Sequence, residues 1–222
     1  MVSTAIYLDN NATTPLRQSA VSAMLSTMGA PANPSSVHRF GREARLIVEN
    51  ARESVAALAR CQPSDVVFTS GGTEANNLVL SQFDYVITSN IEHDSVRSMN
   101  GVDPRITVDS SGVIELASVL AAVNSVDESR KSQTLISVMA ANNETGVVQP
   151  TAEIAAIAKA AGISFHSDMV QIFGKEHIDF AASGVGYASL SAHKIGGPAG
   201  VGALIVRPGL RLTSLLRGGG QE

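Results

Sequence analysis

Short apolar runs alternate along the chain with longer stretches in which apolar residues recur at helical spacing. The runs rich in β-branched and apolar residues predict strands at residues 66–69, 85–88, 134–139, 163–166, 187–190 and 202–206. The helical spacing predicts helices at residues 19–28, 39–60, 74–80, 113–123 and 151–161. Strands that alternate with helices are typical of an α/β protein with a mainly parallel sheet flanked by helices.

Composition narrows the class of protein. A chain of 222 residues can form one large or two small domains, and 44% apolar against 16% charged residues excludes long disordered tracts. The formal charge of −4 disfavours a nucleic-acid-binding surface. No apolar stretch approaches the roughly 18 residues of a membrane span, and residues 1–10 lack the pattern of a secretory signal. We therefore expect a soluble, cytoplasmic protein without nucleic-acid or membrane partners.

Among the four lysines, Lys194 has the most informative surroundings. It follows a predicted strand and precedes a glycine-rich loop. A lysine at a strand end can be desolvated in a cleft, which disfavours the ammonium form and frees the amine for Schiff-base chemistry. Position alone leaves open the alternative of a surface lysine in a turn.

Two further features also lie at predicted strand ends. Asp168 follows the predicted strand 163–166, where ligands bind in parallel sheets. Its carboxylate could pair with a protonated pyridine nitrogen, or it could simply cap a helix. Residues 70–73, Ser-Gly-Gly-Thr, join a strand to a helix, which suits a phosphate but also describes an ordinary turn.

The histidines and the single cysteine give weaker signals. His93 could stack on a flat ring or relay a proton, although a lone histidine is more often structural. The five histidines show no paired helical spacing, so we predict no metal site. Cys61 cannot form an intramolecular disulfide, and we interpret it as a small apolar residue at a helix end.

The order of these motifs closely resembles that of the cysteine desulfurases, which are pyridoxal-phosphate enzymes with the aspartate-aminotransferase fold (fold type I, class V). The resemblance covers essentially the whole chain. It rests on residues 7–15, 33–38, 68–77, 92–93 and 141–146, on Asp168 with Gln171, and on residues 191–194.

The resemblance implies a function for each matching residue. Lys194 would hold pyridoxal 5'-phosphate as a Schiff base, and His93 would stack on its ring, so these two are the predicted catalytic residues. Asp168 would pair with the pyridine nitrogen, and Gln171 would hydrogen-bond the ring oxygen. Asn143 would contact the ring oxygen or the substrate carboxylate. The predicted phosphate-binding residues are Gly72, Thr73, Ser191 and His193.

The resemblance also implies a reaction and partners. In the family, L-cysteine is converted to alanine while its sulfur passes to a mobile cysteine of the enzyme as a persulfide. That sulfur supplies iron–sulfur clusters or tRNA thiolation, through an acceptor or scaffold protein. Family members are homodimers, so we expect a homodimer here.

The sequence departs from the family at its C-terminal end. The nucleophilic cysteine, a phosphate-binding threonine and a substrate-binding arginine are expected beyond the glycine-rich residues 218–220, and Cys61 does not align with that nucleophile. We therefore expect residues 15–222 to form the cofactor-binding large domain, residues 1–14 to belong to the small domain, and most of the small domain to be absent. A fragment, a natural short product and half of a split enzyme would all fit.

Two other functions stay open from the sequence. Another class V enzyme, such as a selenocysteine lyase or an aminotransferase, would share the same early motifs. A non-catalytic chain that binds the cofactor or a partner would explain the expected absence of the nucleophile.

Overall fold

The computed structural model describes residues 5–31 and 33–219. The expectations for residues 1–4 and for Gly220 lie outside these ranges. The strands are β1 (Val66–Thr69), β2 (Tyr85–Ser89), β3 (Val102–Ile106), β4 (Thr134–Ser137), β5 (Ser164–Asp168), β6 (Tyr187–Ser191) and β7 (Gly202–Val206). The α-helices are α1 (Gln18–Met28), α2 (Arg39–Ala59), α3 (Gly72–Leu80), α4 (Asp94–Arg97), α5 (Leu116–Asn124), α6 (Thr151–Ala161) and α7 (Phe180–Ser183).

The strands form one sheet in the order β1-β7-β6-β5-β4-β2-β3. β2, β3, β4, β5 and β6 pair in parallel, whereas β7 runs antiparallel to both of its neighbours, β1 and β6. The predicted α/β class with a mainly parallel sheet is therefore confirmed. Within the described ranges, no helix combines the length and the apolar character needed to cross a membrane.

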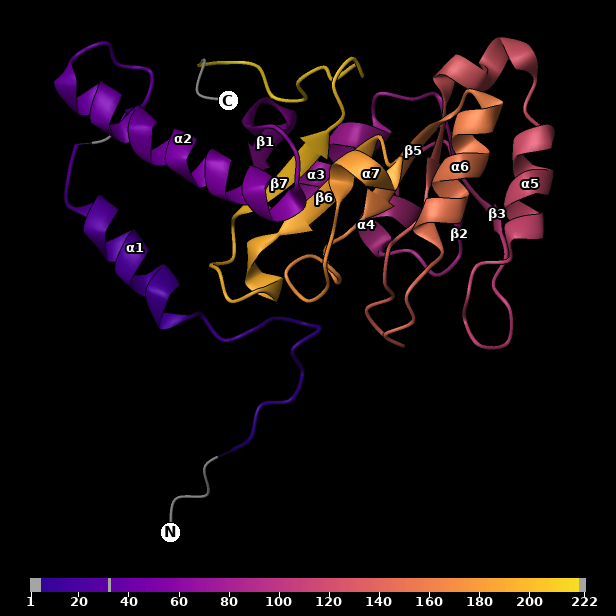
Figure 1. The fold of residues 1–222 in the computed structure, drawn as a ribbon, viewed down its shortest axis with the longest axis horizontal. Coiled ribbons are helices and arrows are strands. Elements are labelled where there is room, and N and C mark those ends of the chain that lie inside the picture. The colour runs from indigo at the N-terminus through magenta and orange to yellow at the C-terminus, as the bar shows by residue number, and fades with distance from the viewer. Residues whose placement is uncertain (1–4, 32, 220–222) are drawn as a thin grey trace.

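Alternate side chains of each strand build two cores, one on each face of the sheet. In β4, Leu135 joins one cluster and Ile136 the other, and Leu204 and Ile205 of β7 divide in the same way. On one face α3 packs against β6 and β7. On the other, α6 packs against β5 and α5 against β3 (Figure 1). Because helices cover both faces of the sheet, strands such as β7 are continuous apolar runs in the sequence rather than alternating ones.

The edge strand β3 was not predicted. Its sequence contains Pro104, which lacks the N–H that an interior strand needs. The structure places β3 at the edge of the sheet, where it pairs with β2 alone. The predicted helix at residues 113–123 also begins later, at Leu116, because Ile114 forms a bridge with Val108.

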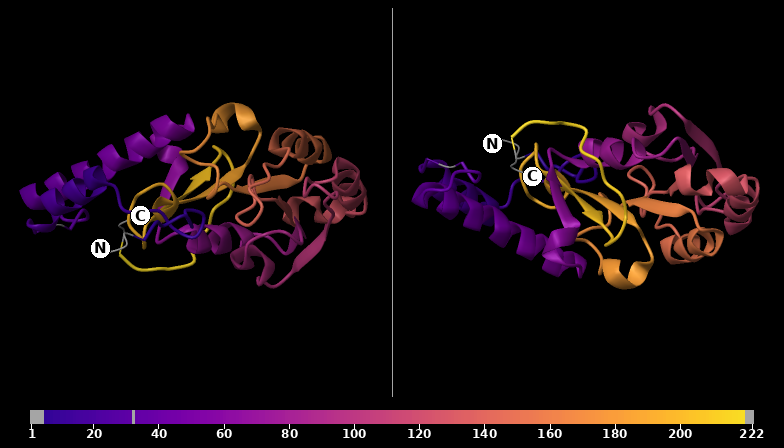
Figure 2. Two further views of the ribbon diagram at one scale, coloured as in Figure 1. Left: turned by 90° about the horizontal axis from the view of Figure 1, so that it is seen from below. Right: turned by 90° about the horizontal axis from the view of Figure 1, so that it is seen from above.

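The N-terminal helices lie apart from the rest of the fold. Figure 1 and Figure 2 show α1 and the first part of α2 at one end of the molecule, away from α5 and α6. The helical spacing of apolar residues that predicted α2 does not bury all of them, since Ile47 and Leu58 are 48% and 64% exposed. The reason is that α2 contacts the body mainly near its C-terminal end, where Ala56 and Ala59 are buried.

Candidate active site

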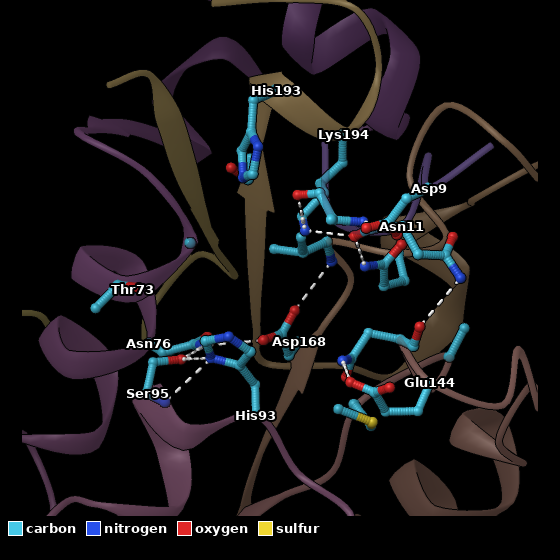
Figure 3. Close-up of a pocket in the computed structure, with 18 residues that line it drawn as sticks. Asp9, Asn11, Thr73, Asn76, His93, Ser95, Glu144, Asp168, His193 and Lys194 are labelled. Atoms are coloured by element: carbon cyan, nitrogen blue, oxygen red, sulfur yellow. Dashed lines mark hydrogen bonds between the residues drawn. The ribbon is translucent and has the colours of Figure 1, made fainter. Parts of the chain in front are cut away.

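A cavity of about 520 Å³ opens where β4, β5 and β6 end and α3 begins. This volume is suitable for a small cofactor. Figure 3 shows side chains from several strand ends meeting there. All the residues predicted to bind or act on a cofactor line this one cavity: Gly72, Thr73, His93, Asn143, Asp168, Gln171, Ser191, His193 and Lys194. Their individual functions stay predictions.

Lys194 ends a short 3-10 turn, Ala192–Lys194, that follows β6. Its Nζ donates hydrogen bonds to the carbonyl oxygens of Asn11, at 2.5 Å, and Ala12, at 2.7 Å. Burial lowers the pKa of Lys194, and the positive charge of Lys175 lowers it further. A lowered pKa makes the neutral amine, which is the nucleophilic form, more accessible near neutral pH.

Asp168 is the last residue of β5 and is buried. Its Oδ2 accepts a hydrogen bond of 2.8 Å from Asn76 Nδ2, and its Oδ1 accepts one of 3.0 Å from the Val170 N–H. Burial raises the pKa of Asp168, and these two hydrogen bonds oppose that rise. Donors on both oxygens favour the ionised carboxylate against the effect of burial. An ionised carboxylate can accept a hydrogen bond from a protonated ring nitrogen.

The turn between β1 and α3 is open for an anion. Gly71 precedes α3 and gives it no side-chain cap, so no side chain at that position occupies the first amides of the helix. A Cβ added at Gly72 would come within 2.8 Å of Val170 Cγ2. Glycine at this position therefore keeps space at the wall of the cavity.

Ser191 is the last residue of β6, and His193 precedes Lys194 in the turn that follows it. The backbone carbonyl of His193 accepts hydrogen bonds from the Thr14 N–H and hydroxyl, both at 2.8 Å. Burial, followed by the charge of Lys194, lowers the pKa of His193. We infer that His193 is a neutral hydrogen-bonding residue at neutral pH. Ser191 is buried at the end of β6.

Asn11 connects several loops of the site, and sequence reasoning did not single it out. Its carbonyl accepts from Gln171 Nε2 at 2.9 Å as well as from Lys194. Its side chain donates to the Asn143 carbonyl at 3.1 Å and accepts from Lys175 Nζ at 3.4 Å. Asn11 belongs to the motif at residues 7–15, but only the structure places that segment against the strand ends.

His93 is the residue that precedes α4 and caps it. Its Nδ1 accepts a hydrogen bond of 3.1 Å from the Ser95 N–H and lies 2.8 Å from Ser95 Oγ. Asn76 and Ser95 also line the cavity and were not predicted as site residues. Asn76 was visible only as part of the motif at residues 68–77, and nothing in the sequence distinguishes it from Asn77.

Two buried titratable groups form hydrogen bonds with residues on or next to the strands that border the cavity. Glu92 is 4% exposed, and its Oε1 accepts from Ser89 Oγ at 2.8 Å and from the Met139 N–H at 3.0 Å. Burial raises the pKa of Glu92 to about 8. His166 lies between Ser137 and Ser189, 2.8 and 3.0 Å from their hydroxyls, and burial lowers its pKa to about 3.

Cys61 lies away from this site. It follows the C-terminal end of α2 and does not line the cavity. Burial, with a smaller contribution from Asp65, raises the pKa of its thiol to about 11. A thiol with a raised pKa is a poor nucleophile at neutral pH.

Comparisons with known proteins agree with this geometry. Residues 6–222 match the family described as aminotransferase class V. Cysteine desulfurase IscS from Dictyoglomus turgidum is 39% identical over 233 residues, which cover 98% of this chain and 58% of the relative.

Solved structures give the same result. A NifS-like protein from Rickettsia africae superposes with a TM-score of 0.93 at 36% identity, covering 98% of this chain and 62% of that one. SspA in complex with cysteine superposes with a TM-score of 0.87 at 33% identity, covering 98% and 66%. The chain thus spans about three fifths of the length of these proteins.

The family match runs over nearly the whole chain, and both the fold and the clustering of motif residues at the strand ends accord with it. The chain belongs to the class V aminotransferase family.

Proposed function

We propose that this chain binds pyridoxal 5'-phosphate and forms the cofactor-binding part of a cysteine desulfurase that acts on L-cysteine. One observation carries the proposal: a lysine amine with a lowered pKa, a buried carboxylate and an uncapped helix start line the same cavity. The names of the relatives support the choice of reaction within the family.

The residues present fit this cofactor. Lys194 offers an amine to an aldehyde carbon, and Asp168 offers a carboxylate to a ring nitrogen. The first turn of α3, where Gly72 leaves room that a Cβ would fill, suits a phosphate. His93 supplies a flat ring on the cavity wall.

Pyridoxal phosphate, when bound, supplies an electron sink for bonds of the substrate amino acid. The chain's own residues bind and orient. Asp168 would keep a proton on the ring nitrogen, Gln171 would bind the ring oxygen, and Gly72 and Thr73 would hold the phosphate together with Ser191 and His193. Lys194 would hold the cofactor between turnovers and would move protons at the substrate, a task that suits an amine whose pKa is lowered by burial.

The substrate proposal is L-cysteine, with Asn143 as a candidate contact for its carboxylate. In the proposed reaction a thiolate attacks the sulfur of the substrate and forms the S–S bond of a persulfide as the carbon–sulfur bond breaks. The electron pair of the broken bond stays with the β-carbon, which takes up a proton, and alanine leaves. Cys61 does not supply that thiolate, because it lies away from the cavity and its thiol has a raised pKa. The thiolate and the final sulfur acceptor are therefore sought outside the residues described here.

The test is a spectroscopic titration of the cofactor-loaded chain with amino acids, followed by an alanine assay with a small thiol as sulfur acceptor. We expect L-cysteine to change the visible spectrum, whereas D-cysteine and L-serine, the matched controls, do not. Alanine should form from L-cysteine and be lost in Lys194→Ala. A selective response to selenocysteine, or transamination of another amino acid, would replace the desulfurase by a different class V enzyme.

We also propose that the chain associates with a second copy, as the family resemblance implies. None of the side chains of α1 is buried. Leu25, Met28 and Phe40 on α1 and α2 are 67%, 70% and 52% exposed. Apolar side chains gathered on projecting helices favour association. The division into a small-domain segment, residues 1–14, and a large domain, residues 15–222, stays a proposal. Within the first segment, residues 11–14 form hydrogen bonds with His193 and Lys194 of the large domain.

A further inference from the structure

An unbroken series of hydrogen bonds joins Asp168 to His93 along the wall of the cavity. Asn76 Nδ2 donates to Asp168 Oδ2 and to Ser95 Oγ, both at 2.8 Å. Ser95 Oγ lies 2.8 Å from His93 Nδ1 (Figure 3). The four side chains come from α3, β5 and the start of α4, so the contact links three separate elements.

The direction of each bond follows from the donors available. The amide of Asn76 has two hydrogens on Nδ2, one for each of its partners. While Asp168 is ionised, the opposite amide orientation would place Oδ1 against its carboxylate, with two acceptors at hydrogen-bond distance. Asn76 must therefore direct its Nδ2 at both Asp168 and Ser95.

The tautomer of His93 is fixed by the donors around its ring. The backbone N–H of Ser95 can only donate, and it lies 3.1 Å from His93 Nδ1, so this ring nitrogen is an acceptor. Ser95 Oγ accepts from Asn76 and gives its own hydrogen to Nδ1. The proton of the neutral imidazole must then lie on Nε2, and His93 presents an N–H at its free nitrogen.

Fold stability alone does not explain an asparagine at position 76. The residue is 1% exposed, and its neighbours Ala75 and Val79 on α3 are apolar and buried. In the described part of the chain, Asn76 Oδ1 has no hydrogen-bond partner. A buried carbonyl without a partner lowers stability, so what accounts for the asparagine is the pair of hydrogen bonds that its amide donates to Asp168 and Ser95.

We propose that Asn76 is a positioning residue that orients Asp168 directly and His93 through Ser95, and that the Ser95 hydroxyl it holds acts with the Ser95 backbone N–H to keep His93 as its Nε2–H tautomer. Nothing in this tautomer assignment depends on the cofactor. Its consequence for the reaction rests on the proposed function: the site would meet its ligand with a carboxylate and an imidazole N–H fixed in advance.

The experiment is long-range ¹H–¹⁵N correlation NMR of the histidine side chains in the ¹⁵N-labelled chain without cofactor. The His93 signals are identified by their loss in His93→Gln. The wild-type chain should show a single neutral Nε2–H tautomer for His93. In Asn76→Ala the hydroxyl of Ser95 loses its donor and can itself accept from the ring, so the Nδ1–H tautomer should gain population, although the Ser95 backbone N–H still favours the Nε2–H form.

Asn77→Ala is the matched control. Asn77 is the next residue of α3 and donates to the Ser95 backbone carbonyl at 2.9 Å, without contacting Asp168. It should leave the His93 tautomer unchanged. If Asn76→Ala does not fold, Ser95→Ala decides the question, since it removes the linking hydroxyl and keeps the contact between Asn76 and Asp168.

A second readout uses the cofactor. Loss of a hydrogen bond to a charged carboxylate should weaken pyridoxal phosphate binding by roughly tenfold or more in Asn76→Ala. An Nδ1–H tautomer in the wild-type chain, or His93 signals that are unchanged in the folded variants, would overturn the proposal. A chain that fails to bind pyridoxal phosphate while the NMR result holds would refute the proposed function alone.

Discussion

The buried carboxyl of Glu92 gives a prediction whose size follows from the structure. The pKa of this group rises from an ordinary 4.5 to about 8 in the folded chain because it is buried. Between these values the unfolded chain has released the proton while the folded chain keeps it. The folded state therefore holds more protons, and stability falls as pH rises from about 4.5 through 8.

The magnitude can be worked from the two pKa values. With about 1.4 kcal/mol for each unit of pKa, the ionisation penalty is about 1 kcal/mol at pH 5 and about 4 kcal/mol at pH 8. Glu92→Gln removes this penalty. The glutamine Oε1 can still accept from Ser89 and Met139, while its amide hydrogens add a cost that does not depend on pH. The stability of Glu92→Gln relative to wild type should therefore rise by about 3 kcal/mol between pH 5 and 8.

The assay is urea unfolding followed by circular dichroism at several pH values from 5 to 8. The comparison uses the difference between the two proteins, so titration of other groups such as His166 cancels. Glu153→Gln, which changes an exposed glutamate of α6, controls for removal of a surface carboxylate. Parallel stability curves for wild type and Glu92→Gln would refute the argument that burial holds Glu92 protonated.

Three further predictions concern the cavity and the surface. Gly72→Ala should weaken pyridoxal phosphate binding, measured by absorbance titration, because the new Cβ would lie 2.8 Å from Val170 Cγ2; unchanged affinity would contradict the phosphate assignment. Thr14→Val should cost about 1–2 kcal/mol in urea unfolding, since its hydroxyl donates to the His193 carbonyl and accepts from the Gly196 N–H; an equally stable variant would show that these bonds contribute nothing net. Light scattering should find association of the wild-type chain that Phe40→Gln reduces, and a monodisperse wild-type monomer would argue against the exposed helices as an interface.

The sequence was sufficient for features that depend on local pattern. The strands of the central sheet and the helix at residues 151–161 follow from apolar periodicity, because both faces of the sheet are covered. The edge strand β3 could not be found in this way, since Pro104 argues against an interior strand and only the fold supplies an edge. The exposure of Ile47 on α2 likewise depends on which part of the helix meets the body.

The site residues likewise include some that the sequence reveals and some that only the fold reveals. Residues that carry recognisable chemistry, such as Lys194 and Asp168, could be singled out from their types and motifs. Asn11 and Asn76 could not be singled out, because asparagine is also common in ordinary turns. Their function here depends on partners that are far away in sequence. Asn76 bonds to Asp168 across 92 positions, and Asn11 contacts Lys194 across 183.

The central claim is that Lys194 is the lysine that binds pyridoxal phosphate. The most direct measurement is borohydride reduction of the chain incubated with the cofactor, followed by peptide mapping by mass spectrometry. We expect one modified lysine, Lys194, and no stable modification in Lys194→Ala. Modification of Lys175 or Lys159 instead, or equal labelling of the Lys194→Ala chain, would contradict it.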